Sequence, residues 1–242
     1  TDPQKKLDIT DSIIILNNVR NEIIINSETL SKFNKNNNRL YYVIHGNMCP
    51  VNKVFVIYSK LFHGVISVSK KVQVIINKYY PNKHIIYLPN KLINNKFINK
   101  QKLTNFDTYI NFGYVGRISK EKNIPMILYA FKKFYQINKK SKLHIFGSEC
   151  DKKYTDYILS IINKIKIDDN IEYYKDNLDY SKIDILILPS VAEGIPYCIV
   201  EASYYNIPCI VSNVGCIDEV ITHKQNGLLF DLDGYPKIDN IF

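Results

Sequence analysis

Two glutamates, Glu193 and Glu201, stand eight positions apart in the stretch EGIPYCIVE, just after an aliphatic run that ends at Ser190. The run predicts a buried strand over 184–188, and Pro196 favours the first turn of a helix. Glu193 would then lie in the loop at the carboxyl end of a strand, where α/β folds bind ligands. Glu201 comes five residues after Pro196, so it would lie ~7.5 Å along the helix axis from that residue. This spacing suits two parts of one extended ligand better than a carboxylate pair flanking a single bond.

The residues between the glutamates suit a bound anion. Gly194 has no side chain, so a ligand can approach the backbone closely. The amide of Ile195 would point along the following helix, whose N-terminus favours negative charge. Taken alone, the two glutamates are also consistent with solvated side chains, which is the commoner arrangement.

Basic residues follow an earlier strand in the stretch GYVGRISKEKN. Gly113 and Gly116 bracket the end of that strand, and Arg117 and Lys122 lie in the loop that leads to the next helix. A planar guanidinium and a mobile ammonium at such a position suit a diphosphate. By themselves, these residues are again also consistent with a solvated loop.

Apolar patterns in the second half of the chain alternate between strands and helices. The helical spacing of apolar residues predicts helices over 124–137, 154–165 and 196–205. Nearly continuous apolar runs predict strands at 109–115, 143–146, 171–174, 184–188, 208–212 and 227–230. This alternation is typical of a doubly wound α/β domain, with a parallel sheet covered on both faces.

The first half of the chain shows the same alternation of predicted strands and helices. Strands are predicted at 12–16, 40–44, 64–68 and 84–88, and helices at 54–62 and 70–79. A polar stretch rich in Asn and Lys follows and reads as a linker. We therefore expect an α/β fold of two Rossmann-like lobes, over 1–90 and 108–242, joined by a linker at 91–107.

The composition is that of an ordinary globular chain with excess positive charge. Of the 242 residues, 46% are hydrophobic, and no apolar run approaches the ~20 residues that span a bilayer. The net charge is +9, but the lysines are scattered singly in a sequence rich in Ile, Asn, Lys and Tyr, so we expect no nucleic-acid surface. Five cysteines without zinc spacing favour a reducing compartment, and we expect the cytoplasm.

Together, these pieces resemble one known family. The sequence is similar to the retaining group 1 glycosyltransferases, which have GT-B architecture. The similarity lies in a strand with Gly-Arg-x4-Lys, a further α/β segment, Pro-Ser-x3-Glu-Gly-x-Pro-x4-Glu and then SNVGCIDEVITHKQNGLLF. The resemblance covers 109–231. It extends more weakly to YYVIHG, GVISVSKKV and YLPN in the first half.

The resemblance implies a role for each matched side chain. Arg117 and Lys122 would neutralise the diphosphate of a nucleotide-sugar donor and stabilise it as a leaving group. Glu193 would bind hydroxyls of the transferred sugar, and Glu201 would bind the ribose. His45, which follows a strand of the first lobe, would face the reacting sugar.

The resemblance also implies the remaining donor contacts and the reaction. These contacts would come from Gly116, Ser190, Gly194 and Ile195. The implied activity is transfer of a sugar, with retention, from a nucleoside-diphosphate donor to a glycan or lipid-linked acceptor. Positioned Arg and Lys can stabilise the leaving group without a metal or other cofactor. A lipid-linked acceptor would favour peripheral contact with the inner face of a membrane.

The sequence departs from the family pattern in some places. Pro196 stands where many members have Gly, Asn123 follows Lys122 where Gly is common, and Gly215-Cys216 replaces a Gly-Gly pair. The first strand and glycine-rich loop of the family's N-terminal lobe have no counterpart here, nor do its terminal helices. We therefore expect a piece of a longer chain, with 1–90 as the later part of that lobe.

Other motifs allow other chemistry. Asp231-Leu-Asp-Gly spells a DxD metal motif but reads as a turn after the last strand. Ser190 with His45 or His223 lacks the Gly-x-Ser-x-Gly elbow of a hydrolase. His144 lies inside an apolar strand and is most simply a hydrogen-bonded core residue.

Two other functions stay open beside transfer. One is a module that binds a nucleotide sugar and transfers nothing. The other is a GT-B sugar-nucleotide epimerase, over which the combination of Glu193, Glu201, Arg117 and Lys122 favours a transferase.

Overall fold

A computed structural model describes residues 11–17, 37–46, 59–91, 109–175 and 177–233. The chain divides into two compact units, Thr1–Pro89 and Asn90–Phe242, each built around its own parallel sheet. Apart from its first residue, the linker expected at 91–107 lies outside the described residues. The expected α/β class with two Rossmann-like units is confirmed.

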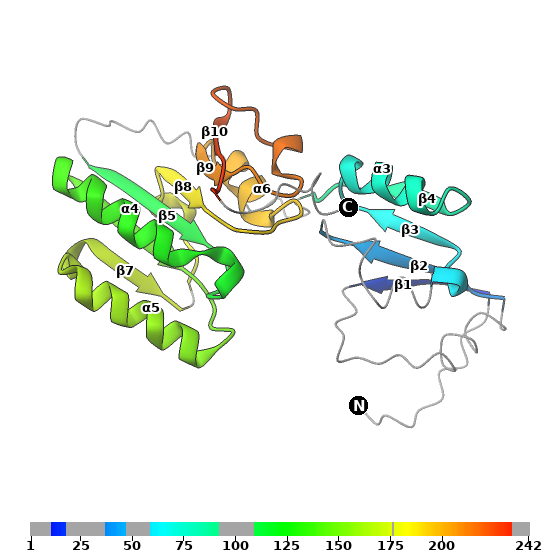
Figure 1. Cartoon of the computed structure of the whole chain (residues 1–242), viewed down its shortest axis with the longest axis horizontal. Coiled ribbons are helices and arrows are strands. Elements are labelled where there is room, and N and C mark those ends of the chain that lie inside the picture. Colours follow the sequence, from blue (N-terminus) through cyan, green and yellow to red (C-terminus); the bar gives the residue numbers. More distant parts are fainter. Residues whose placement is uncertain (1–10, 18–36, 47–58, 92–108, 176, 234–242) are drawn as a thin grey trace. The chain divides into compact units, whose positions relative to one another are not determined.

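The first unit is a parallel sheet with the strand order β1-β2-β3-β4. Helix α3 (Lys70–Tyr79) lies on one face of the sheet in Figure 1 and buries Val72 and Ile76. Ser69 caps this helix, because its hydroxyl accepts a hydrogen bond from the amide of Val72 at 3.2 Å. The strands are β1 (Ile13–Asn17), β2 (Arg39–Ile44), β3 (Gly64–Ser67) and β4 (His84–Tyr87).

One prediction for this unit is wrong in its described part. The helix expected over 54–62 falls mostly outside the described residues, and Ser59–Leu61 forms a 3-10 turn, η2. The chain must enter β3 at Gly64, and Phe62 is buried against the ring of Tyr42 at 5.3 Å between centroids. A 3-10 turn is tighter than an α-helical turn, so it places Phe62 in the core just before β3 begins.

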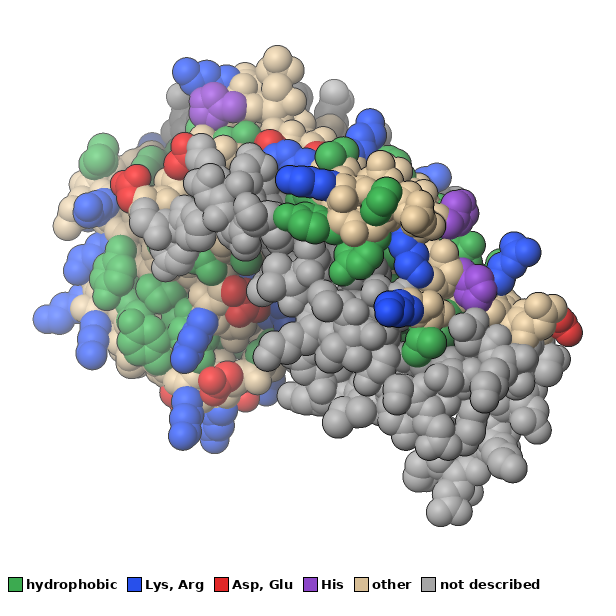
Figure 2. Space-filling model, turned by 45° about the vertical axis from the view of Figure 1, so that its right-hand side comes forward, with side chains coloured by type: hydrophobic (Ala, Val, Ile, Leu, Met, Phe, Trp, Pro, Cys, Tyr) green, Lys and Arg blue, Asp and Glu red, His purple; other side chains and the backbone are tan. Residues whose placement is uncertain are grey.

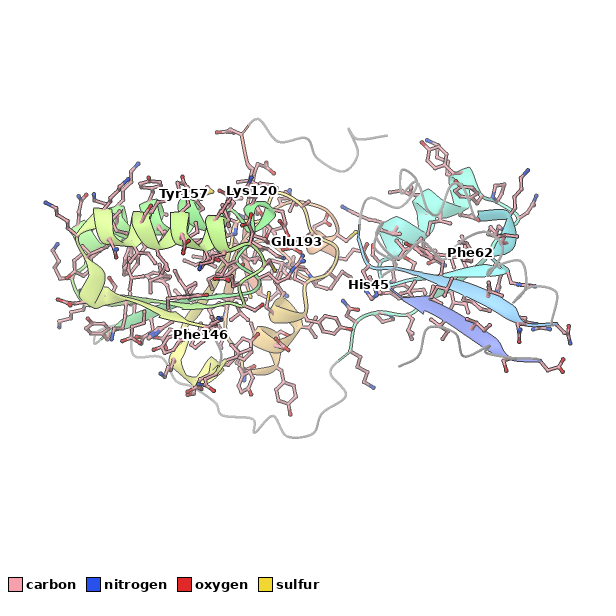
Figure 3. All side chains as sticks on the ribbon, turned by 90° about the horizontal axis from the view of Figure 1, so that it is seen from below. His45, Phe62, Lys120, Phe146, Tyr157 and Glu193 are labelled. Carbon is pink, nitrogen blue, oxygen red and sulfur yellow. The ribbon has the colours of Figure 1, made fainter. Side chains whose placement is uncertain are left out.

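The second unit is a parallel sheet with the strand order β10-β9-β8-β5-β6-β7. Figures 1 and 3 show α4 and α5 on one face of this sheet and α6 on the other. The predicted strands and helices are all present. Their bounds are β5 (Ile110–Val115), α4 (Ile124–Ile137), β6 (Ser141–Phe146), α5 (Lys152–Ile165), β7 (Ile171–Tyr174), β8 (Ile185–Leu188), α6 (Tyr197–Tyr204), β9 (Cys209–Ser212) and β10 (Gly227–Phe230).

The strand order of this sheet reverses between β5 and β8. The chain builds outward from β5 through β6 to β7, then returns to the other side of β5 and builds outward through β8, β9 and β10. Strands β5 and β8 pair directly, with Phe112 opposite Ile185. The loops that leave these two strands therefore start side by side, at the switch point where α/β sheets bind ligands.

Helix α4 shows why this sequence folds locally as predicted. Pro125 stands in its first turn, where a missing amide costs nothing. Ile124, Ile127, Leu128 and Phe131 recur at helical spacing and are all buried against the sheet. The apolar spacing and the packing thus agree over the whole helix.

A polar network crosses the opposite face of the sheet and includes His144. Its Nε2 lies 3.3 Å from Oδ1 of Asn111, and its Nδ1 lies 3.4 Å from the Tyr174 hydroxyl. The amide group of Asn111 donates in turn to Asp184 at 2.8 Å. His144 is buried, so the prediction that it is a hydrogen-bonded core residue is confirmed.

Glu172 lies at the end of this network. Its carboxylate accepts hydrogen bonds from Lys142 and from the Tyr174 hydroxyl, and it lies near His144. These contacts, led by Lys142, lower the pKa of Glu172 to about 2.

The charged side chains are dispersed on the face that Figure 2 shows. Figure 2 shows Lys and Arg side chains scattered among polar and hydrophobic ones on the face in view. Within the described ranges, every helix is too short or too polar to cross a bilayer.

The packing of α4 predicts that two equivalent substitutions on this helix differ in their effect on stability. Ile127 is 1% exposed and Ile137, on the same helix, is 87% exposed. Ile127→Ala should lower the free energy of unfolding by about 2–5 kcal/mol, because it leaves a cavity. Ile137→Ala should change it by less than about 0.5 kcal/mol. Urea denaturation followed by circular dichroism measures both, and equal losses would contradict the packing described.

The depressed pKa of Glu172 predicts an acid-dependent contribution to stability. A carboxylate whose pKa is lowered on folding stabilises the fold above its unfolded value of 4.5, and this contribution is lost as the pH falls toward 2. Glu172→Gln should therefore destabilise the protein near neutral pH and flatten the fall in stability over that acid range. Urea denaturation as a function of pH measures this, and parallel curves for both proteins would count against the network.

Candidate functional site

Two loops meet at the switch point of the second unit. The first leaves β5 at Gly116 and contains the 3-10 turn η3 (Lys120–Lys122), and the second leaves β8 and leads to α6. The amide of Val191 donates to the carbonyl of Glu121 at 2.8 Å, which joins the loops. Figure 3 shows Lys120 and Glu193 at this same end of the unit.

Lys122 and Glu193 form an ion pair across the two loops. The Lys122 Nζ lies 2.5 Å from the Glu193 Oε1, and the side chains are only 13% and 9% exposed. Charge attraction is stronger away from bulk water, so this contact fixes both groups firmly. The structure thus brings together a cation predicted for the diphosphate and a carboxylate predicted for the sugar.

Arg117 stands beside this pair but remains open to solvent. Its guanidinium contacts Glu121 at 3.1 Å, and the two side chains are 51% and 40% exposed. Burial raises the pKa of Glu121. The polar groups around the carboxylate and the charges of Arg117 and Lys122 outweigh burial and lower this pKa overall. An exposed pair of this kind is weak, so the guanidinium can exchange partners readily.

The first loop is held in place by crowded backbone contacts. The Tyr114 hydroxyl donates to the carbonyl of Arg117 at 2.6 Å, and the amide of Ile118 donates to the carbonyl of Ser148 at 2.9 Å. A Cβ at Gly147 would lie 2.6 Å from the carbonyl oxygen of Gly116, so that position has no room for a side chain. The loop that carries Arg117 is therefore positioned by the sheet beneath it.

Asn123 explains one of the departures from the family pattern. It has φ +51°, in the left-handed region, and it separates η3 from α4. Glycine adopts this conformation without cost, and Asn is among the side chains that tolerate it best. The substitution thus preserves the turn after Lys122.

The second loop holds Ser190 in the core and leaves the start of α6 uncapped. Ser190 is 0% exposed, its carbonyl accepts from the Ser212 hydroxyl at 2.6 Å, and its own hydroxyl has no partner among the described residues. Pro196 was expected as the first helical residue, but its ψ of 133° is extended and α6 begins at Tyr197. Because Pro196 offers no side-chain acceptor, no side chain of this residue caps the first amides of α6, and the amide of Ile199 donates to the Pro196 carbonyl at 3.2 Å.

Gly194 and Ile195 lie between Ser190 and the start of α6. Gly194 is partly exposed, whereas the side chain of Ile195 is buried and its carbonyl accepts from the Asn90 side chain at 2.7 Å. The predicted donor contacts of Gly116, Ser190, Gly194 and Ile195 stay predictions.

Glu201 lies on the second turn of α6 and has a partner that the sequence did not suggest. The Tyr180 hydroxyl donates to its Oε2 at 2.5 Å. Tyr180 belongs to η5 (Tyr180–Lys182), the 3-10 turn before β8. Burial first, and then the hydrogen bond to Glu201, raise the pKa of Tyr180.

His45 belongs to the first unit, directly after β2. Burial lowers its pKa, so the imidazole is neutral at physiological pH. Its predicted place opposite the reacting sugar stays a prediction.

Comparison with known proteins decides the family. The sequence model of "Glycosyl transferases group 1" matches residues 95–233. The chain belongs to this family of group 1 glycosyltransferases. The match contains both loops and α6, and His45 lies outside it.

Two of the relatives are named for the transfer of a sugar. The capsular polysaccharide biosynthesis glycosyltransferase CapM of Staphylococcus aureus is 28% identical over 207 residues, which cover 82% of this chain and 53% of CapM. The UDP-Gal:alpha-D-GlcNAc-diphosphoundecaprenol alpha-1,3-galactosyltransferase of Escherichia coli is 38% identical over 57 residues, 24% of this chain and 15% of that enzyme. The chain thus spans about half of CapM.

A solved structure confirms the fold class. The pneumococcal O-GlcNAc transferase GtfA, in complex with UDP and GlcNAc, superimposes with a TM-score of 0.76 over 96% of this chain and 48% of GtfA, at 15% identity. The likeness shows a GT-B glycosyltransferase fold.

The Lys122–Glu193 contact predicts strong coupling in stability. Lys122→Met and Glu193→Gln should each destabilise the protein by about 2–4 kcal/mol, because each leaves its partner poorly compensated in a nearly buried site. The double variant should recover part of the loss, whereas Arg117→Met, which breaks an exposed pair, should cost less than about 1 kcal/mol. Urea denaturation of the four variants measures the coupling, and additive single losses would contradict it.

Proposed function

We propose that this group 1 glycosyltransferase transfers a hexose from a nucleoside-diphosphate sugar to a glycan or lipid-linked acceptor, with retention and without a metal. The observation that carries this is the Lys122–Glu193 ion pair at the switch point, with Arg117 open beside it. Cationic groups for a diphosphate and a carboxylate for a sugar stand within one small region.

The two cations suit the departing diphosphate in different ways. Lys122 has three donors, and one contact with Glu193 leaves others for phosphate oxygens. Arg117 can exchange its weak contact with Glu121 for a bidentate contact with phosphate. Fixed positive charge where negative charge develops is the main way to stabilise such a leaving group.

The two glutamates suit the two sugars of the donor. Glu193 lies in the loop that also contacts Lys122, so it would bind hydroxyls of the hexose next to the diphosphate. Glu201 lies on the second turn of α6, so it would bind the ribose hydroxyls. The amides at the start of α6 would support the phosphates between them.

Retention follows if the acceptor attacks from the face that the diphosphate leaves. The bond from the anomeric carbon to the diphosphate oxygen breaks as the bond to the acceptor oxygen forms. The acceptor proton then passes to the departing phosphate, and Arg117 and Lys122 neutralise the remaining charge. His45 would contact the reacting sugar from the first unit.

The relatives support the class of donor and acceptor. GtfA is described in complex with UDP and GlcNAc, and the Escherichia coli enzyme is named for UDP-Gal and a diphosphoundecaprenol acceptor. We infer a UDP-hexose donor for this chain and a polyprenyl-linked glycan as acceptor. We place the protein in the cytoplasm, where its net charge of +9 would favour peripheral contact with an anionic membrane face.

A second candidate is binding of the nucleotide sugar without transfer. The family match at 95–233 falls on the unit that carries the proposed donor-binding residues, so this unit would suffice for binding. Turnover separates the two functions, because the binding module would hold the donor and release no nucleoside diphosphate.

Substitution of the charged residues tests the transferase. Glu193→Ala and Arg117→Ala should each lower kcat about 10²–10³-fold, since each removes a group that stabilises the transition state. Lys120→Ala, an exposed neighbour in η3, is the control and should retain normal turnover. Release of UDP from UDP-hexoses with a polyprenyl-diphosphate glycan acceptor measures kcat in the whole protein. Near-normal rates for both alanine variants would refute the assignment.

The remaining parts of the proposal need separate measurements. A thermal-shift screen should show a larger stabilisation by UDP-sugars than by GDP- or ADP-sugars. Turnover should be unchanged by a chelator, and NMR of the first product should show the anomeric configuration of the donor. An inverted product or loss of activity with the chelator would remove retention or metal independence from the proposal.

A further inference from the structure

A buried tyrosine holds the carboxylate of Glu201 in one orientation. The Tyr180 hydroxyl lies 2.5 Å from Glu201 Oε2, across the space between η5 and α6. Among the described residues, Tyr180 is the one whose side chain hydrogen bonds to Glu201. The contact joins residues 21 positions apart, so the local helix does not impose it.

The position of Tyr180 is set by its own surroundings. The side chain is 5% exposed, and its ring stacks on Tyr205 with centroids 5.1 Å apart and planes at 18°. Tyr205 comes four residues after Glu201, so both lie on the same face of the helix and its C-cap. Tyr180 therefore packs along this face and reaches Glu201 with its hydroxyl.

The turn that carries Tyr180 is also fixed. Asp179 caps η5, and its carboxylate accepts from the amide of Ser181 at 2.9 Å and from the Ser181 hydroxyl at 2.6 Å. The amide of Ile183 donates back to the carbonyl of Tyr180 at 3.1 Å. The chain then enters β8, so Tyr180 is anchored by the same strand that leads to Glu193.

The direction of the hydrogen bond follows from the chemistry of the two groups. A carboxylate only accepts, and a phenol with its proton donates. Burial and the contact with Glu201 raise the pKa of Tyr180, so the hydroxyl keeps its proton at physiological pH. The Oε2 of Glu201 thus accepts from Tyr180, and no side chain of the described residues donates to its Oε1.

We propose that Tyr180 is a positioning residue, which orients the Glu201 carboxylate so that its other oxygen accepts hydrogen bonds from the donor ribose. This inference rests on the proposed function, since it requires Glu201 to contact the ribose. A glutamate held in one rotamer loses less entropy when the ligand binds, so the benefit appears in affinity for ligands that carry ribose hydroxyls.

Tyr180→Phe tests the proposal, because it removes the hydroxyl and keeps the ring stacked on Tyr205. Isothermal titration calorimetry compares UDP with 2′,3′-dideoxy-UDP, which lacks both ribose hydroxyls. In the variant, the dissociation constant for UDP should rise about 5- to 20-fold, while that for the dideoxy compound should change less than about 2-fold.

Tyr135→Phe is the matched control. The Tyr135 hydroxyl accepts a hydrogen bond from the side chain of Asn170, just before β7, at 3.0 Å. The Tyr135→Phe variant therefore also loses one hydroxyl contact, but at a place away from Glu201. Both dissociation constants should stay at the wild-type values in this variant. Thermal unfolding of both variants shows whether they fold alike.

The outcomes separate this inference from the proposed function. If wild-type protein favours UDP over the dideoxy compound and Tyr180→Phe keeps that preference, the positioning role is refuted and the transferase stands. If Tyr180→Phe lowers the affinity for both nucleotides equally, the positioning role is also refuted, because an equal loss of affinity would reflect a general change in packing. If wild-type protein binds no nucleoside diphosphate, or Glu201→Gln leaves the preference for ribose unchanged, the site assignment falls and this inference falls with it.

Discussion

The reversal of strand order between β5 and β8 is the constraint on which the site depends. Because these two strands are neighbours, the loops that leave them must start side by side, although Lys122 and Glu193 are 71 residues apart in sequence. Everything else at the site refines this placement. Gly147 leaves room for the first loop, and the Val191 amide joins it to the second.

The sequence was sufficient for the architecture of the second unit, and the reason is physical. Its helices and strands bury apolar residues at regular spacing, so periodicity and packing agree, as α4 shows over 124–137. The 3-10 turns η2, η3 and η5 were not predicted, because three residues leave no period to detect. Pro196 was placed one residue too far into α6, because only its extended ψ of 133° reveals the cap.

The site was predictable as a set of residues and not as a set of contacts. Arg117, Lys122, Glu193 and Glu201 stood out because these charged groups follow buried strands or lie inside the helix that comes next. The resemblance assigned Lys122 and Glu193 to different parts of the donor, so their mutual contact was unexpected. Tyr180 gave no signal at all, since it is one of 19 tyrosines and its partner is fixed only by the fold.

The mutual contact of Lys122 and Glu193 has a consequence for small anions. While the ammonium and the carboxylate neutralise each other, orthophosphate meets little net attraction at this spot and would have to separate the two groups to bind. A molecule that offers an anionic oxygen to one and a hydroxyl to the other satisfies both at once. The closed pair therefore presents a hydrogen-bond donor and an acceptor together at one spot, and not a bare positive charge.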